Sequence, residues 1–139
     1  MRRPAEEEAR RWLLQAVDEF ADACDLRKRE RFYLALFHFQ QAAENALKAF
    51  LYLKLGEPEV FRTHSVAELI EATEGIDPGF ARLKRTKSLD AYYIPTRYPN
   101  GLPGGVPSRF YDDPAEAEEA ERLAGPVIEA VEGAFPGGA

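Results

Sequence analysis

Apolar residues recur at helical spacing along the first part of the chain. Between Ala5 and Cys24 they follow the i, i+3, i+4, i+7 pattern of one helical face, which predicts a helix over this range. We expect its first turn to hold the acidic run 6–8, because the helix dipole favours negative charge there. We expect the polar run 25–30 to connect this helix to the next one.

A second and stronger apolar pattern follows. It runs from Phe32 to Leu53, and the segment contains neither Gly nor Pro before Gly56. This pattern predicts a helix of about 26 residues, roughly 40 Å long at 1.5 Å per residue. We expect it to form the centre of the fold, since its apolar face is wide and long.

Two shorter helices are indicated by their first residues. Ser65 and Glu68 match the capping box, in which the Ser hydroxyl accepts from the Glu68 N–H and the Glu carboxylate reaches back. This predicts a helix that ends near Gly75. The pair Asp77-Pro78 predicts another helix that runs to about Ala91, because Asp is favoured at the N-cap and Pro at the first helical position.

Proline and glycine dominate residues 93–112, which excludes a helix and disfavours a strand. We therefore expect a loop of about twenty residues, and its aromatic residues argue against plain disorder. Asp113 and Pro114 then open the last helix. Pro126 is expected to kink or break that helix ahead of a flexible tail over 132–139.

These elements predict an all-α fold, an up-and-down bundle of four to five helices with a long Pro/Gly-rich loop before the last helix. One domain spans 1–139, with its core over about 5–131. The hydrophobic content of 45% excludes a disordered chain. The single cysteine cannot form an internal disulfide, and no run approaches the roughly 18 apolar residues of a membrane span. We expect a soluble cytoplasmic protein without membrane contact.

Basic residues are clustered, although the net charge is −6. Residues 81–111 carry six bases and one acid, whereas 112–132 carry eight acids and one base. A second basic cluster lies at 27–31, between the first two helices. If the two clusters meet in space, they form a phosphate-binding surface with tyrosines for base stacking. The alternative is an ordinary solvated surface.

Polar side chains also occur on the long second helix. Gln41, Glu44 and Lys48 share one face, and Glu44 precedes Lys48 in the favourable i, i+4 orientation. This face is either an exposed stripe or a buried seam. In the buried case, Glu44 or the glutamine pair Gln40 and Gln41 meets a cation such as Arg97, because a buried carboxylate needs a partner.

The sequence lacks the residue patterns of most familiar enzyme sites. The two histidines, His38 and His64, have no metal-ligand spacing, and with one cysteine we expect no metal site. Neither a hydrolytic triad nor a GxxxxGK[ST] phosphate loop is visible. We expect no cofactor.

Three blocks of the sequence resemble a known family. They are Phe37–Ala49, Arg62–Ser65 and Tyr92–Pro99, and in this order they resemble the HEPN domain family (higher eukaryotes and prokaryotes nucleotide-binding). The resemblance covers nearly the whole chain. It implies an all-α bundle that is commonly a homodimer and often the partner of a minimal nucleotidyltransferase in a two-component or toxin–antitoxin system.

Many members of that family are metal-independent ribonucleases, in which an Arg is followed, after four to six residues, by a His. The resemblance implies that the His transfers protons and the Arg stabilises the phosphate. Here Arg97 matches, but Leu102, Pro103 and Gly104 stand where the His belongs. The chain therefore resembles the branch with Arg-Tyr-Pro. His64 takes the acid–base role only if the fold brings it close to Arg97.

The leading hypothesis is a nucleotide- or RNA-binding module that partners a nucleotidyltransferase and is not itself an enzyme. The alternatives are a metal-independent ribonuclease with a rearranged site around Arg97 and a purely structural dimerisation module. The candidate catalytic residues are Arg97 and His64. The expected ligand- and phosphate-binding residues are Arg97, Tyr98, Tyr93, Lys48, Glu44, Gln40, Gln41, Lys84, Arg85 and Lys87.

Overall fold

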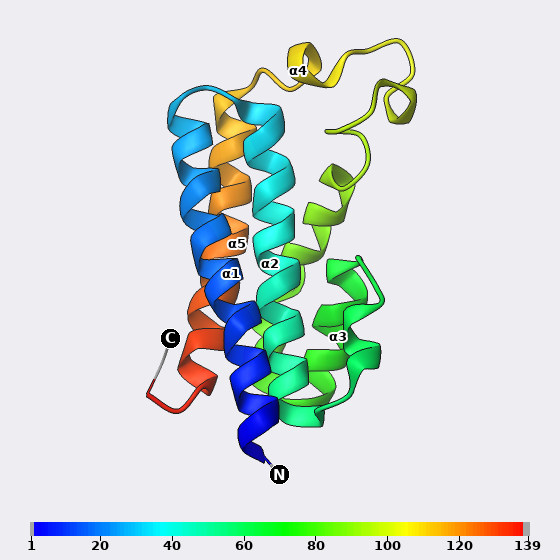
Figure 1. Cartoon of the computed structure of the whole chain (residues 1–139). Coiled ribbons are helices and arrows are strands. Elements are labelled where there is room, and N and C mark those ends of the chain that lie inside the picture. The colour runs from blue at the N-terminus through cyan, green and yellow to red at the C-terminus, as the bar shows by residue number, and fades with distance from the viewer. Residues whose placement is uncertain (1, 138–139) are drawn as a thin grey trace.

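The long helices of this protein run up and down in an elongated bundle (Figure 1). The computed structural model describes residues 2–137. Its elements are α1 (Arg2–Lys28), α2 (Phe32–Leu55), η1 (Pro58–Phe61), α3 (Val66–Ile76), η2 (Pro78–Tyr92), η3 (Pro99–Gly101), α4 (Pro107–Phe110) and α5 (Pro114–Ala134), where η marks a 3₁₀ helix. The described residues contain no strand, so the all-α bundle is confirmed. No helix among them is long and apolar enough to span a membrane.

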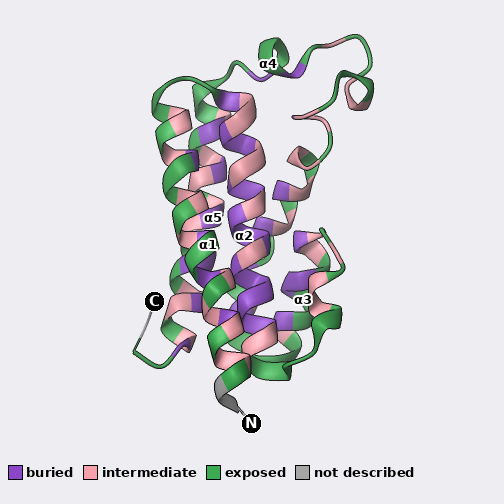
Figure 2. Ribbon diagram, in the orientation of Figure 1, coloured by how far each residue is buried: buried purple, intermediate pink, exposed green. Residues whose placement is uncertain are grey.

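Helix α2 forms the centre of the core. It packs against α1 and α5 on one side and against α3 and η2 on the other. The buried residues concentrate along it (Figure 2). It ends as expected at Gly56, whose φ of 68° is easily adopted by glycine and whose N–H donates to the Tyr52 carbonyl at 2.8 Å.

Helix α1 is longer at both ends than the sequence pattern predicted. It begins at Arg2, so the acidic run 6–8 does not lie in the first turn. It ends at Lys28, so only residues 29–31 connect it to α2. The expectation of a polar connection over 25–30 is therefore wrong. Leu, Arg and Lys are good helix formers, and the two bases in the last turn favour the negative end of the helix dipole.

The segment expected to form an α-helix after Asp77 is the 3₁₀ helix η2. Its buried residues are Phe80, Leu83, Thr86 and Leu89, which recur every third residue. A 3₁₀ helix has three residues per turn and places all four on one face, whereas an α-helix would rotate them away from the core. The capping role of the Asp is confirmed, because its side chain accepts from the Gly79 N–H at 3.0 Å.

The loop over 93–112 lies at the end of the bundle opposite the start of α1 (Figure 1). The expectation that it contains no helix is wrong, since η3 and α4 are single helical turns that each begin with proline. Tyr92 and Tyr111 close the loop with an edge-to-face contact at 6.0 Å, and the Tyr92 hydroxyl donates to Glu116 at 2.8 Å. Burial, and then the Glu116 carboxylate, raises the pKa of both tyrosines above its usual range.

Helix α5 continues through Pro126, so the expected break is wrong. Proline removes only one main-chain hydrogen bond here, and the buried Val127, Ile128 and Val131 keep the next turn packed on the core. The helix also takes in the first part of the expected flexible tail over 132–139. Phe135 is buried beyond it, whereas residues 138 and 139 lie outside the described residues.

Candidate functional site

Five side chains from three parts of the fold meet beside the polar face of α2. We call them the His64–Arg97 cluster, which consists of Phe37, His64, Tyr93, Arg97 and Tyr98. The ring of Tyr93 joins the two candidate catalytic residues. It stacks on the imidazole of His64 at 5.2 Å, and the guanidinium carbon of Arg97 lies 4.5 Å from its centroid.

Arg97 is held by aromatic rings and one main-chain bond. Its guanidinium carbon lies 4.7 Å from the centroid of Phe37 and 4.9 Å from that of Tyr98. Its Nε donates to the Tyr93 carbonyl at 2.8 Å. Within residues 2–137 no carboxylate pairs with this guanidinium, so its charge is positioned but not neutralised.

Beneath the cluster, Glu44 is the acceptor of a buried polar network. It accepts from Lys48 Nζ at 2.6 Å and from Gln41 Nε2 at 3.1 Å, and His64 Nδ1 lies 3.1 Å away. The side chains of Glu44 and Lys48 are each only 2% exposed. The polar face of α2 is therefore a buried seam, and the cation that meets Glu44 is Lys48 and not Arg97.

His64 connects this buried network to the surface. Its side chain is 56% exposed, although its Nδ1 contacts the buried Glu44. A carboxylate at Nδ1 favours the tautomer that carries the proton there, which leaves Nε2 for exchange with a ligand. The ring of Tyr93 contacts both His64 and Arg97, so the fold brings the two candidate catalytic residues to the same part of the molecule.

The comparison with protein families identifies the family of the chain. The model of the HEPN domain matches residues 9–134. The chain belongs to the HEPN family. Among solved structures, TT1696 from Thermus thermophilus is 38% identical with a TM-score of 0.76, over 90% of this chain and 96% of that one. ST0689, an archaeal HEPN homologue, is 28% identical with a TM-score of 0.73, over 92% and 98% of the two chains. No curated protein matches.

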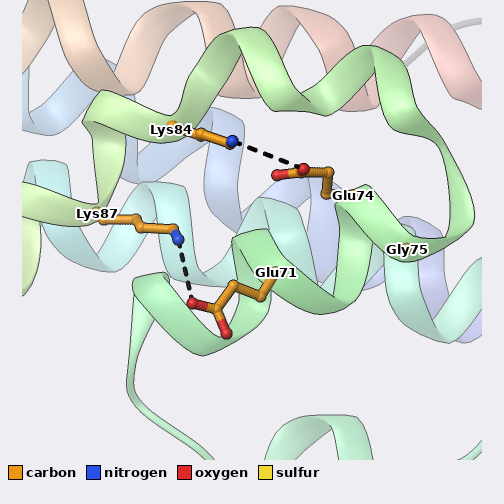
Figure 3. Close-up of a pocket in the computed structure, with 5 residues that line it drawn as sticks. All are labelled: Glu71, Glu74, Gly75, Lys84 and Lys87. Atoms are coloured by element: carbon orange, nitrogen blue, oxygen red, sulfur yellow. Dashed lines mark hydrogen bonds and ion pairs between the residues drawn. The ribbon is translucent and has the colours of Figure 1, made fainter.

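Three of the candidate phosphate-binding residues lie elsewhere in this HEPN domain. Two of them, Lys84 and Lys87, line a groove of about 380 Å³ between η2 and α3 (Figure 3). Lys84 lies 3.9 Å from Glu74, and Lys87 lies 3.1 Å from Glu71. Each lysine of this groove therefore faces an acid, which lowers its attraction for phosphate.

The third candidate phosphate-binding residue outside the site is Arg85. It pairs with an acid of α5, and so does Arg27 from the basic residues at 27–31. Arg85 contacts Glu119 at 3.3 Å, and Arg27 contacts Glu121 at 2.6 Å. The acidic stretch that follows residues 81–111 in sequence thus folds back on the bases. Among the described residues, no group of His, Cys, Asp and Glu has the arrangement of a metal site.

The sequence did not single out two residues that matter at this site. Phe37 precedes His38 in the first of the three blocks, and only the fold places its ring against Arg97. Asp90 is visible as the one acid among the bases of 81–111. The isolated position of this acid was the one sequence signal that it has a specific binding partner. In the structure its carboxylate binds the first turn of α3.

Proposed function

We propose that this HEPN domain binds the phosphate group of a nucleotide or an RNA at the His64–Arg97 cluster. The observation that carries the proposal is Arg97, a cation that three aromatic rings and one carbonyl hold in place without an acidic partner among the described residues. The half-exposed imidazole of His64 supplies a second polar group beside the same tyrosine. Such a pair suits an anion, because among the described residues Arg97 has no carboxylate to give up, and His64 contacts Glu44 only through Nδ1, which leaves Nε2 for the ligand.

The other residues of the site divide by burial. Lys48 and Gln40 are buried, so in this proposal they hold the site and do not touch the ligand. Tyr98 is 47% exposed and offers a ring face to a base. Stacking on such a ring tolerates any base, which fits a ligand recognised mainly through its phosphate.

The test compares two arginines. A fluorescent nucleotide and a short single-stranded RNA are titrated at low salt with EDTA present, against wild type, Arg97→Ala and Arg85→Ala. We expect Arg97→Ala to weaken binding at least about 10-fold. The matched control Arg85→Ala should change it less than about 2-fold, because Arg85 is exposed and already pairs with Glu119. Equal losses, or no binding by wild type, would overturn the proposal.

A metal-independent ribonuclease is the second candidate, favoured by the shared contact of His64 and Arg97 with Tyr93. In this reaction His64 Nε2 takes the proton of the ribose 2′-OH, and the 2′-oxygen attacks the phosphorus to form a 2′,3′-cyclic phosphate. The bond from phosphorus to the 5′-oxygen breaks, and the 5′-oxygen takes a proton from water or from the imidazolium of His64. Glu44 at Nδ1 stabilises the imidazolium, and Arg97 stabilises the charge on the phosphate oxygens.

The two candidates are separated by cleavage of single-stranded RNA in EDTA. If the domain is a ribonuclease, His64→Gln should lower the rate by about 10²-fold or more. His38→Gln is the control, since His38 also contacts a carboxylate, Glu19 at 2.8 Å, but lies outside the cluster. If the protein binds RNA but does not cleave it, the ribonuclease candidate is wrong and the binding function is retained.

We also propose the partners that the family resemblance implies, a second copy of the chain and a minimal nucleotidyltransferase. Exposed apolar side chains on the loop at 93–112 support contact with another protein; they are Ile94, Tyr98, Val106 and Phe110. Sedimentation of the pure protein, with and without nucleotide, separates this proposal from a purely structural dimer. A nucleotide that binds the folded dimer must stabilise the dimer, whereas the stability of a purely structural dimer would not change when nucleotide is added.

A further inference from the structure

Asp90 of η2 binds the first turn of α3 and its surroundings through four hydrogen bonds. Its carboxylate accepts from the backbone N–H groups of Val66 at 2.7 Å and Ala67 at 2.9 Å. It also accepts from the Ser65 hydroxyl at 3.0 Å and from the Gln40 amide at 3.3 Å. Asp90 thus joins three elements, η2, α3 and α2.

These bonds replace part of the predicted capping box. The Ser65 hydroxyl accepts from the Glu68 N–H at 3.1 Å, as expected. The Ser65 N–H, however, donates to the Thr63 hydroxyl at 3.0 Å and not to a glutamate carboxylate. The carboxylate that accepts from the open N–H groups of Val66 and Ala67 is therefore that of Asp90, which comes from the neighbouring helix η2.

Asp90 and Gln40 together fix the main chain around His64. His64 directly precedes Ser65, and its carbonyl accepts from the Gln40 amide at 3.1 Å. Gln40 is fully buried on α2, so it binds the His64 carbonyl and Asp90 from a fixed position. The backbone at 64–67 is consequently held from the α2 side by Gln40 and from the η2 side by Asp90.

We propose that Asp90 is the positioning residue for His64 in the ligand site. Without its carboxylate, the N–H groups of Val66 and Ala67 lose their acceptor, and the first turn of α3 loses its attachment to η2. His64 then loses the fixed backbone that places its ring between Glu44 and Tyr93. This inference rests on the proposed function for its effect on ligand binding, but its effect on the His64 ring does not need a ligand.

The test removes the carboxylate and then supplies it from solution. Asp90→Gly leaves a space in which formate or acetate can bind the same N–H groups. The readouts are the NMR signals of the His64 ring and the affinity for a fluorescent nucleotide. We expect Asp90→Gly to shift the ring signals and to weaken nucleotide binding about 10-fold, as the loss of a charge-assisted hydrogen bond would. Formate should restore both, and chloride at the same ionic strength should not.

Asp77→Gly is the matched control. The Asp77 carboxylate caps η2 but accepts only from the Gly79 N–H at an exposed position, so its removal should leave the His64 signals unchanged with or without formate. Wild type in formate controls for competition between formate and the nucleotide. If Asp90→Gly does not fold, Asp90→Asn keeps one acceptor oxygen and should produce a smaller shift of the same signals.

Unchanged His64 signals in a folded Asp90→Gly variant would overturn the inference. A shift that formate fails to reverse would do the same, because it would assign the effect to general loss of packing. The failure of the proposed function is distinguishable. In that case wild type does not bind the nucleotide, while the His64 ring still responds to Asp90→Gly and to formate.

Discussion

Arg97 and the lysines of η2 belong to one basic stretch of sequence, but their surroundings differ. Lys84 and Lys87 face Glu74 and Glu71 across the groove between η2 and α3. Arg97 instead contacts aromatic rings, and none of the carboxylates in the described part of the chain pairs with it. The number of bases in a segment therefore does not measure its attraction for phosphate. What decides it is whether the fold brings acids to those bases.

The ion pairs of these two regions also differ, because one is buried and the other is exposed. The Glu44–Lys48 pair beneath the His64–Arg97 cluster is 2% exposed on both sides. The Lys84–Glu74 pair has a lysine that is 60% exposed and a distance of 3.9 Å. A buried charge without its partner is costly, whereas an exposed pair contributes little because water and salt screen it.

The largest effect should come from breaking the buried pair. Lys48→Met leaves the Glu44 carboxylate buried without its cation, and we expect the free energy of unfolding to fall by about 3–5 kcal/mol. Lys84→Met is the matched control and should cost less than about 1 kcal/mol. Urea denaturation measures both.

A second variant sharpens this result. Glu44→Gln combined with Lys48→Met removes both charges, and it should be more stable than Lys48→Met alone, because no uncompensated charge remains. If Lys48→Met costs no more than Lys84→Met, the distinction between the buried and the exposed pair is wrong.

The next effect concerns the helical surface where α1 meets α5. Burial, and then the Glu121 carboxylate, raises the pKa of the Cys24 thiol from 9.0 to about 11. Because only the thiolate reacts, its fraction at pH 8 falls about 100-fold. We expect iodoacetamide to alkylate the folded protein about 10-fold more slowly than the urea-unfolded chain, because the higher nucleophilicity of the less acidic thiolate offsets part of its lower fraction.

The sign of the pH dependence follows from the same shift. The alkylation rate of the folded protein should still rise with pH above 9, where the rate of the unfolded chain levels off. Glu121→Gln should speed the reaction, because it removes a negative charge that opposes the thiolate. Equal rates for folded and unfolded protein would show that neither burial nor Glu121 raises the pKa of the thiol in the folded protein.

A smaller effect tests why the site uses arginine. Arg97→Lys keeps the charge but loses the planar group that lies against Phe37, Tyr93 and Tyr98. We expect nucleotide affinity to fall about 5-fold, or roughly 1 kcal/mol, less than in Arg97→Ala. Arg85→Lys is the control and should have no effect. Full affinity of Arg97→Lys would mean that the aromatic contacts do not matter to binding.

Local signals predicted much of the fold. Gly56 ends α2, and Ser65, Asp77 and Asp113 cap helices with the side-chain bonds that their sequence positions indicate. These features depend on residues within one turn of each other. The three-residue period of the buried face of η2 is also present in the sequence, but the cap at Asp77 favours an α-helix and a 3₁₀ helix equally.

The candidate site could be predicted only in part, because its contacts join distant segments. The polar face of α2 does not by itself indicate burial, because the residues that contact Glu44 and Lys48 from outside the helix, His64 and Trp12, lie far away in sequence. The contact of His64 and Arg97 with Tyr93 depends on where η2 ends. The pairing of Arg85 with Glu119 depends on how α5 packs against η2, which no local pattern specifies.

The smallest effect should come from the groove between η2 and α3. Lys87→Gln removes the partner of Glu71, whose side chain is 69% exposed, and we expect a change in unfolding free energy below about 0.5 kcal/mol. The difference should vanish in high salt, because the pair is accessible to ions. Nucleotide binding should also stay within about 2-fold of wild type, since the charge that Lys87 offers is already met by an acid. A large loss of binding in Lys87→Gln, with Arg97→Ala unaffected, would move the ligand site from the His64–Arg97 cluster to this groove.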